Sequence, residues 1–472
     1  MFTNLKHLHF LGICGTAMGA VAAALRDQGY VVTGSDEDVY PPMSTFLEEK
    51  GIVLSRGYRP ENIPADAELI VVGNAIRRGN PEVEEVLNRK LPYCSLPEVL
   101  KFFFLRGRHN IVVSGTHGKT TTTSLVTWIL QSAGLAPGYM IGGLPNNLGQ
   151  GAQFNASPYY VIEGDEYDTA FFDKRSKFVH YLPELLVINN VEFDHADIYK
   201  DVDEIKLSFR RLVNIVPGNG LILFNADDQN CHDVVAAAHC KTVAVGLGEN
   251  ATSEGRIENI RYEAGATRFR LAGEEYATPM AGEFNVRNCA MAVSAARFYG
   301  LTPDAIRQGL SSFTGVRRRQ EVRGEANGVK VVDDFGHHPT AILETLRGLR
   351  QLHSEAGKIW ALFEPRSNST RRAVFQHQLA AAFEPADGVV MARVAKLEQI
   401  PESERLDPER VVEDIRASGK PAFYEDGTAA IVERAVELAS PGDMIVVFSN
   451  GGFDGIHAKL LSALAAPATV AA

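Results

Sequence analysis

Ser114-Gly115-Thr116-His117-Gly118-Lys119-Thr120-Thr121-Thr122 is the stretch around which this 472-residue chain is organised. Residues 111–113 before it are apolar and predict a buried strand, and residues 124–130 after it have the apolar spacing of a helix. A strand, a glycine turn and a helix that begins with Lys-Thr are typical of a phosphate-binding loop, because backbone N–H groups and the helix N-terminus face an anion there. The stretch therefore predicts a nucleotide site.

Two side chains of this loop have expected roles. Lys119 is predicted to contact the β- and γ-phosphates of a nucleotide, and the Thr120 hydroxyl to contact Mg²⁺. The standard motif has four residues between its two glycines, whereas two residues separate Gly115 from Gly118. The alternative is an ordinary glycine turn, but the flanking strand and the Lys-Thr run favour nucleotide binding.

Composition limits the class of protein. The length predicts about three domains, and 45% hydrophobic with 22% charged residues is typical of a soluble globular protein. A net charge of −11 argues against a dedicated nucleic-acid binder. The five cysteines form no CxxC pair, and neither a signal peptide nor a long apolar stretch is evident. We expect a cytoplasmic protein with no nucleic-acid, membrane or obligate protein partner.

The N-terminal segment has the pattern of a dinucleotide-binding unit. A strand at residues 7–13, a glycine turn, an Ala-rich helix and a second strand that ends at Asp36 form its first half. Cys14 stands where the middle glycine of that pattern would be, so a plain βαβ unit is the alternative. A later strand, residues 69–73, ends at a turn that is expected to face a ligand, Asn74-Ala75-Ile76.

Acidic and histidine side chains follow two further strands after the phosphate loop. Residues 159–162 lead into Glu163, Asp165, Glu166 and Asp168, where a magnesium ligand is expected, with Glu163 nearest the strand. A solvated acidic turn is the alternative. Residues 185–188 lead to the pair Asp194-His195, which is expected to act as a ligand or an orienting pair.

The chain between the phosphate loop and the C-terminal segment carries further polar signals. Residues 251–280 alternate and predict a small antiparallel patch. Asn285 and Asn288 lie three residues apart, a spacing suited to base or ribose hydrogen bonds, with helix capping by Asn285 as the alternative. Residues 315–321 are interpreted as a linker whose basic triplet, ending at Arg319, is either solvated surface or a phosphate clamp across a domain cleft.

The C-terminal segment alternates strands and helices again, which predicts another mostly parallel open sheet. Its strand ends carry polar groups that are expected to line one crevice: Asp334, His337, His338, Arg366, Asn368 and Asn450. The fold class is therefore α/β with three domains. We expect a Rossmann-like domain at 1–107, a central ATPase-like domain at 108–316 with a mostly parallel sheet and the antiparallel patch, and a Rossmann-like domain at 317–472.

Several of these motifs resemble those of the Mur ligases, and the resemblance covers nearly the whole chain. The resembling motifs are the phosphate loop, Glu163-x-Asp165-Glu-x-Asp168, Asn189-Asn-Val-Glu-x-Asp194-His195, Gly282-x-x-Asn285-Val-x-Asn288 and Asp334-Phe-Gly-His-His-Pro339. The resemblance implies an ATP-dependent amide-bond ligase that acts on UDP-N-acetylmuramate through an acyl phosphate and releases ADP and phosphate.

The resemblance also implies residue roles. The implied catalytic residues are Lys119, His117, Glu163 and His195, and the implied magnesium ligands are Thr120, Glu163 and His195. The implied ATP site consists of Gly115, Thr116, His117, Gly118, Lys119, Thr120, Thr121, Asn285, Asn288, Arg319 and Asp334. The implied UDP-sugar site consists of Gly12, Cys14, Gly15, Ser35, Asp36, Asn74, Ala75 and Ile76. The residues implied to face the amine donor are His337, His338, Arg366 and Asn368.

Two segments favour a peptide donor over alanine. The loop at residues 12–16 and the segment Phe363-Glu-Pro-Arg366-Ser-Asn368 are similar to the branch that adds the recycled tripeptide L-Ala-γ-D-Glu-meso-diaminopimelate to the muramate. An alanine-adding ligase of cell-wall synthesis is the nearest alternative. A nucleotide-binding regulator without catalysis is a further one, although Lys119, Glu163 and His195 are all present.

Overall fold

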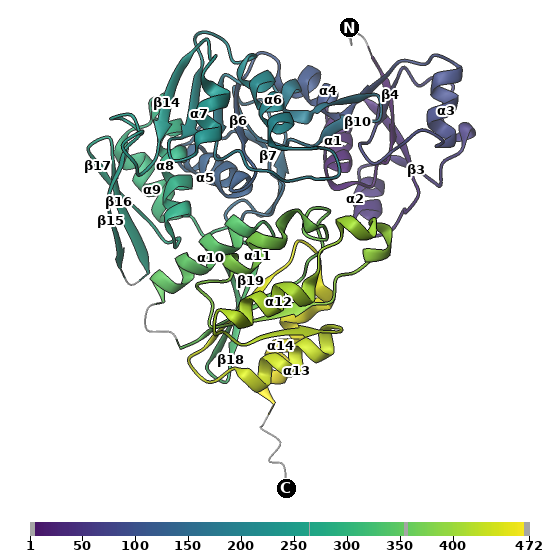
Figure 1. The fold of residues 1–472 in the computed structure, drawn as a ribbon. Coiled ribbons are helices and arrows are strands. Elements are labelled where there is room, and N and C mark those ends of the chain that lie inside the picture. Colours follow the sequence, from purple (N-terminus) through teal and green to yellow (C-terminus); the bar gives the residue numbers. More distant parts are fainter. Residues whose placement is uncertain (1–4, 264, 354–356, 467–472) are drawn as a thin grey trace.

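The computed structural model describes residues 5–263, 265–353 and 357–466, and their three large sheets follow one another along the chain (Figure 1). The N-terminal sheet is entirely parallel, in the order β3-β2-β1-β4-β5. Its strands are β1 (His7–Leu11), β2 (Val31–Asp36), β3 (Val53–Arg56), β4 (Leu69–Val72) and β5 (Tyr93–Ser95). Its helices are α1 (Thr16–Asp27), α2 (Met43–Glu49), α3 (Pro81–Asn88) and α4 (Leu96–Val99), and a π-helix follows at Leu100–Leu105.

The central sheet has the order β14-β13-β12-β6-β9-β7-β8, and only its last pair is antiparallel among the described strands. Its strands are β6 (His109–Ser114), β7 (Gly138–Met140), β8 (Ala152–Gln153), β9 (Tyr159–Gly164), β12 (Leu185–Ile188), β13 (Leu221–Asn225) and β14 (Lys241–Val245). Its helices are α5 (Lys119–Ser132), α6 (Val202–Val213), α7 (Gln229–Val235), α8 (Glu283–Phe298) and α9 (Pro303–Ser311). Two antiparallel additions are the hairpin β10 (Asp168–Ala170) and β11 (Asp173–Ser176), and the patch β15 (Ile257–Glu263), β16 (Ala266–Leu271) and β17 (Glu274–Thr278).

The C-terminal sheet has the order β18-β19-β23-β20-β21-β22 and lies below the other two sheets in Figure 1. Its strands are β18 (Glu321–Ala326), β19 (Val329–Asp334), β20 (Ile359–Phe363), β21 (Gly388–Ala392), β22 (Ala422–Glu425) and β23 (Met444–Phe448). Only β18 pairs antiparallel among the described strands. Its helices are α10 (Pro339–Leu352), α11 (Gln376–Ala382), α12 (Pro408–Ala417), α13 (Thr428–Leu438) and α14 (Ile456–Ala465).

Burial on both faces explains why the central strands are short apolar runs. Ile111 and Val113 of β6 point into a core with residues of α5, α8 and α9, whereas Val112 packs on the other face with residues of α6 and α7. Ser114 at the end of β6 is in register with Gly164 of β9 and Ile188 of β12. The loops after these three strands therefore meet at one edge of the sheet, where the phosphate loop lies.

The predicted α/β fold with three successive sheets is confirmed, with two local differences. The segment interpreted as a linker runs directly into β18, an edge strand whose Val322 is 59% exposed, so no buried run marks it in the sequence. Helix α8 begins at Glu283, whereas the Ala-rich residues 290–299 predict a start at Ala290, and Gly282 is its N-cap. Among the described residues, no helix is long and apolar enough to cross a membrane.

Candidate functional site

The phosphate loop joins β6 to α5 in a conformation that only glycine adopts easily. Gly115 has φ of 136° and Gly118, the N-cap of α5, has φ of 79°. A Cβ atom on Gly118 would lie 2.9 Å from both Asn189 Nδ2 and Asn288 Oδ1. No described side chain caps α5, so its first N–H groups remain available to an anion.

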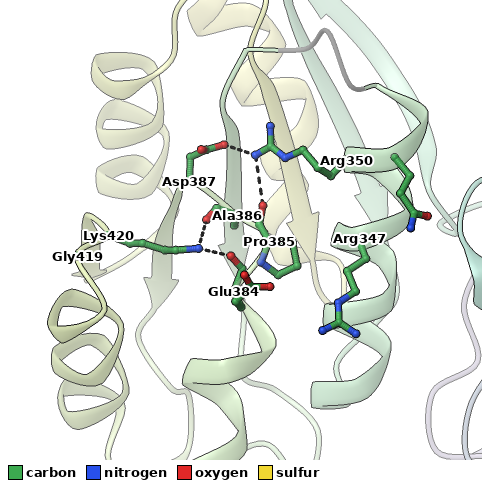
Figure 2. Close-up of a pocket in the computed structure, with 9 residues that line it drawn as sticks. Arg347, Arg350, Glu384, Pro385, Ala386, Asp387, Gly419 and Lys420 are labelled. Carbon is green, nitrogen blue, oxygen red and sulfur yellow. Dashed lines mark hydrogen bonds and ion pairs between the residues drawn. The ribbon is translucent and has the colours of Figure 1, made fainter.

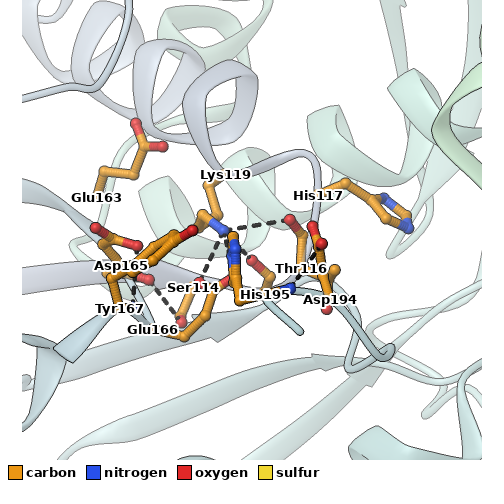
Figure 3. Close-up of polar contacts among 12 residues, drawn as sticks. Ser114, Thr116, His117, Lys119, Glu163, Asp165, Glu166, Tyr167, Asp194 and His195 are labelled. Carbon is orange, nitrogen blue, oxygen red and sulfur yellow. Dashed lines mark hydrogen bonds and ion pairs between the residues drawn. The ribbon is translucent and has the colours of Figure 1, made fainter. Parts of the chain in front are cut away.

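Lys119 lies in a buried charge cluster beside this loop (Figure 3). Its Nζ atom donates to Glu166 Oε1 and Oε2 at 2.9 and 2.8 Å and to the Gly115 carbonyl at 2.6 Å. His195 Nε2 lies 2.9 Å from Glu166 Oε1, and the Glu166 side chain is only 2% exposed. Burial alone would lower the pKa of Lys119, but the carboxylates of Glu166 and Asp165 raise it, so the lysine stays charged. Burial also opposes the charged form of His195, but Glu166 raises its pKa.

Glu163 forms a separate group with Thr120. Thr120 Oγ1 donates to Glu163 Oε1 at 3.0 Å, and the Gly142 N–H donates to Glu163 Oε2 at 2.7 Å. Figure 3 shows the Glu163 carboxylate pointing away from the cluster around Glu166. The structure thus divides the implied magnesium ligands, with Thr120 beside Glu163 and His195 beside Glu166. The Thr120 hydroxyl and the Glu163 carboxylate are oxygen ligands of the kind that suit Mg²⁺. Burial raises the pKa of Glu163 in this structure.

The residues implied to bind the nucleoside extend from the loop toward α8 and β19. Asn288 Oδ1 accepts from Thr122 Oγ1 at 3.1 Å, and its amide donates to Asn285 Oδ1 at 3.2 Å. Asn285 therefore lies on the same helix face as Asn288 and does not cap α8, since Gly282 is the N-cap. Thr121, a further implied loop residue, is buried in the first turn of α5.

Two residues from the C-terminal side reach this group. Arg319 Nη2 lies 3.4 Å from Thr120 Oγ1, and the Arg319 guanidinium lies over the Phe335 ring at 4.9 Å. Asp334, at the end of β19, accepts from the N–H groups of Gln320 and Gly336 at 2.9 and 2.7 Å, and burial raises its pKa. Arg319 therefore reaches across the boundary between the central and C-terminal sheets, where its role as a phosphate clamp stays a prediction.

The implied UDP-sugar residues meet at the carboxyl ends of β1, β2 and β4. The Gly12 N–H donates to the Ser35 carbonyl at 2.8 Å, and the Cys14 N–H donates to Asp36 Oδ2 at 2.8 Å. Burial, together with Asp36, raises the pKa of the Cys14 thiol to about 11. The other implied residues are Gly15, the N-cap of α1, and the turn Asn74-Ala75-Ile76, in which Ile76 lies against Gly12 and Asn74 donates to the Asp168 carbonyl.

Glu82 is a residue of this region that the sequence analysis missed. It is 0% exposed, although it lies in the first turn of α3, where a glutamate is usually solvated. Its carboxylate accepts from Ser35 Oγ, from Asn62 Nδ2 at 2.7 Å and from the Arg59 N–H at 3.0 Å. Glu82 therefore supports the strand end that holds the glycine turn. Asn80-Pro81 is typical of a helix start, and nothing in this local pattern indicates burial of Glu82.

The residues implied to face the amine donor come from two loops of the C-terminal sheet, after β19 and after β20. His338 caps α10 and its Nε2 donates to the Phe193 carbonyl at 3.2 Å, while His337 Nε2 lies 3.7 Å from Asp194 Oδ2. Both histidines thus lie against the central sheet. Arg366 and Asn368 lie in the loop after β20, and the Arg366 side chain is 56% exposed.

A pocket at the opposite end of the strands of the C-terminal sheet contains none of these residues (Figure 2). It lies where Asp387 precedes β21, at the amino end of that strand. Lys420 donates to the carbonyls of Glu384 and Ala386, and Arg350 pairs with Asp387. These cations already have acceptors, so the pocket is not a candidate site.

Comparisons with known proteins agree with this geometry. Three family models match successive parts of the chain: the Mur ligase family catalytic domain at residues 7–107, the Mur ligase middle domain at 113–296 and the Mur ligase glutamate ligase domain at 318–451. The UDP-N-acetylmuramate–L-alanyl-γ-D-glutamyl-meso-2,6-diaminoheptandioate ligase of Escherichia coli (strain K12) is 44% identical over 467 residues, which cover 98% of this chain and 99% of that protein. The chain belongs to the Mur ligase family. It is therefore an ATP-dependent enzyme that forms peptide bonds, as the motifs predicted.

Two further Mur ligases match this chain over nearly its full length at lower sequence identity. The UDP-N-acetylmuramate–L-alanine ligase of Rhizobium meliloti (strain 1021) is 34% identical, with 97% of both chains covered. The crystal structure of a murein peptide ligase from Psychrobacter arcticus 273-4 matches with a TM-score of 0.68 and 35% identity, over 98% of this chain and all of that one.

Proposed function

We propose that this Mur ligase joins UDP-N-acetylmuramate to the tripeptide L-alanyl-γ-D-glutamyl-meso-diaminopimelate and forms ADP and phosphate, in peptidoglycan recycling. The observation that carries the proposal is the 44% identity over nearly the full length of the tripeptide-adding enzyme, against 34% for an alanine-adding one. The segments at residues 12–16 and 363–368, which favour a peptide donor over alanine, agree with this choice.

Each of the three domains would bind one substrate. We assign the UDP-sugar to residues 1–107, ATP to residues 108–316 and the tripeptide to residues 317–472. The hydrogen bonds of Gly12 and Cys14 at the β1 strand end support the first assignment. The phosphate loop with Asn285, Asn288, Arg319 and Asp334 around it supports the second. The exposed Arg366, which a peptide bearing carboxylates would suit, supports the third.

The chemistry follows from the weakness of a carboxylate as an electrophile. The muramate carboxylate oxygen attacks the γ-phosphorus of ATP, the bond between the β- and γ-phosphates breaks, and ADP leaves. The α-amine of the tripeptide then attacks the carbonyl carbon of the acyl phosphate, loses a proton, and phosphate leaves with the former carboxylate oxygen. Positioning and charge stabilisation account for most of the catalysis in such transfers.

Lys119 contributes positive charge at the loop. In this structure Glu166 holds its ammonium group, and the phosphate oxygens of ATP would replace that partner. Because Glu166 also contacts His195, the carboxylate keeps a hydrogen-bond partner when the lysine turns to the nucleotide. Thr120 and Glu163 would hold Mg²⁺, which when bound would offset the negative charge of the phosphates. We further propose that the enzyme works in the cytoplasm and needs no nucleic acid, membrane or protein partner.

A substrate-choice assay tests the proposal. ADP release is measured with UDP-N-acetylmuramate and ATP, plus either L-alanine or the tripeptide. We expect turnover with the tripeptide and little above background with alanine. Strong turnover with alanine and none with the tripeptide would show that the chain is an alanine-adding ligase.

A further inference from the structure

The segment at residues 190–196, which follows β12, lies between the phosphate loop and the C-terminal sheet. On the loop side, Thr116 Oγ1 exchanges hydrogen bonds with the backbone of Glu192, at 2.8 Å from its N–H and 3.1 Å to its carbonyl. On the C-terminal side, Ser369 Oγ donates to Asp194 Oδ1 at 2.6 Å. The segment therefore contacts both parts of the molecule whose substrates must meet.

His117 is held in one orientation and one tautomer by this segment. Its backbone N–H donates to Asn190 Oδ1 at 2.9 Å, which fixes the amide so that Asn190 Nδ2 faces His117 Nδ1 at 2.9 Å. Nδ1 must therefore accept, and the ring proton lies on Nε2. Nε2 in turn donates to Glu192 Oε1 at 2.9 Å. Figure 3 shows this ring turned away from Lys119.

The second oxygen of Glu192 is bound from the C-terminal side. Thr340 Oγ1, in the first turn of α10, donates to Glu192 Oε2 at 2.6 Å. His338 Nδ1 lies 3.5 Å from the same oxygen, but this nitrogen accepts from the Thr340 N–H, and the ring proton on Nε2 goes to Phe193. Thr340 is thus the donor that links α10 to Glu192.

A metal site is the competing interpretation of this cluster. One ligand atom each of His117, Glu192 and His338 lie within 4.8 Å of one another. A metal on His117 Nε2 would move the ring proton to Nδ1, where it would face the N–H of Asn190 Nδ2. A metal on His338 Nδ1 would displace the helix-capping bond to Thr340. Both imidazoles are therefore set for hydrogen bonding and not for metal binding.

We propose that Glu192 is a positioning residue that couples docking of the C-terminal sheet to the shape of the phosphate loop. Thr340 binds one carboxylate oxygen only when α10 lies against the central sheet, and the other oxygen then holds the His117 ring of the phosphate loop in its one orientation. This inference rests on the proposed function, because closure matters only if the tripeptide arrives on the C-terminal side. Through this link, the His117 ring is oriented in the docked state, in which the amine and the acyl phosphate meet.

The variant Thr340→Val tests the link, since valine keeps the branched shape and removes the hydroxyl. We expect kcat with all three substrates to fall about ten- to hundredfold, the range for losing a hydrogen bond to a charged group. The KM values for ATP and UDP-N-acetylmuramate should stay close to wild type, because the bond forms only in the docked state. Thr340→Ser, which keeps the hydroxyl, should restore kcat.

A matched control is Thr345→Val, the same change at a buried position further along α10. We expect it to leave kcat close to wild type, and thermal unfolding of all three variants separates folding defects from catalytic ones. Wild-type kcat in Thr340→Val, or a loss that Thr340→Ser does not restore, would overturn the inference. A wild-type enzyme that releases no ADP with the tripeptide would refute the proposed function instead.

Discussion

Replacing Lys119 by methionine separates the two roles that the structure gives this lysine. Methionine keeps most of the apolar volume of the side chain but removes the charge and its donors. In the wild type those donors bind Glu166 twice and the Gly115 and Thr116 carbonyls. The variant therefore leaves the Glu166 carboxylate, 2% exposed, with His195 as its remaining side-chain partner in the described structure.

The expected cost follows from this burial. Removing one partner of a buried ion pair typically destabilises a protein by about 3–5 kcal/mol, because the other charge is left without compensation. Adding Glu166→Gln neutralises that charge, and the glutamine oxygen can still accept from His195. We expect the double variant to recover about half or more of the lost free energy of unfolding, as coupled neighbours do in double-mutant cycles.

Urea unfolding and ADP release are measured for the single variants, the double variant and the wild type. Catalysis should be lost in both variants that lack Lys119, whatever their stability, because neither can place a positive charge on the transferred phosphate. Near-normal ADP release by Lys119→Met would refute the assigned loop. Equal stability of Lys119→Met and the wild type would refute the buried charge cluster.

Two further predictions concern the N-terminal sheet and pH. Glu82→Ala leaves the donors of Ser35, Asn62 and Arg59 without a carboxylate, at about 1–3 kcal/mol for each buried donor. Urea unfolding should therefore show a large loss of stability, and steady-state kinetics should show a larger rise in KM for UDP-N-acetylmuramate than for ATP. An unchanged unfolding curve would contradict the support role. Burial would raise the pKa of Asp165, but Lys177 and Lys119 lower it to about 2. Its stabilising contribution is therefore complete above its ordinary value of 3.8 and is lost as the pH falls toward 2, so the acid-induced loss of stability should be smaller in Asp165→Asn than in wild type.

The parts of the fold that carry a local pattern were predictable. The run at residues 111–113 is apolar because both faces of β6 are covered, and Gly118 is required by its positive φ and by Asn189 and Asn288 beside it. Asn285 and Asn288 could be placed together because their spacing is that of one helix face. In each case a short sequence pattern marks the position, although the contacts that require it include residues far along the chain.

Contacts between distant segments could not be predicted in the same way. The bond between Thr340 and Glu192 joins positions 148 residues apart, and neither residue type is unusual at a strand end or a helix start. Glu82 is buried because Ser35, Asn62 and Arg59 converge on it from other elements. Glu166, which pairs with Lys119, was one of four acids at the end of β9 and just after it, and the sequence favoured Glu163 because that residue is nearest the apolar run. Side-chain direction at a loop is settled by tertiary packing.

An acyl-phosphate intermediate transfers one oxygen atom from the muramate carboxylate to the released phosphate. UDP-N-acetylmuramate with ¹⁸O in both carboxylate oxygens is incubated with enzyme, ATP and the tripeptide, and the released phosphate and the amide product are examined by mass spectrometry. We predict one ¹⁸O atom in each phosphate and one in the new amide carbonyl. Phosphate without label, alongside a formed amide, would contradict activation of the carboxylate by the phosphate loop.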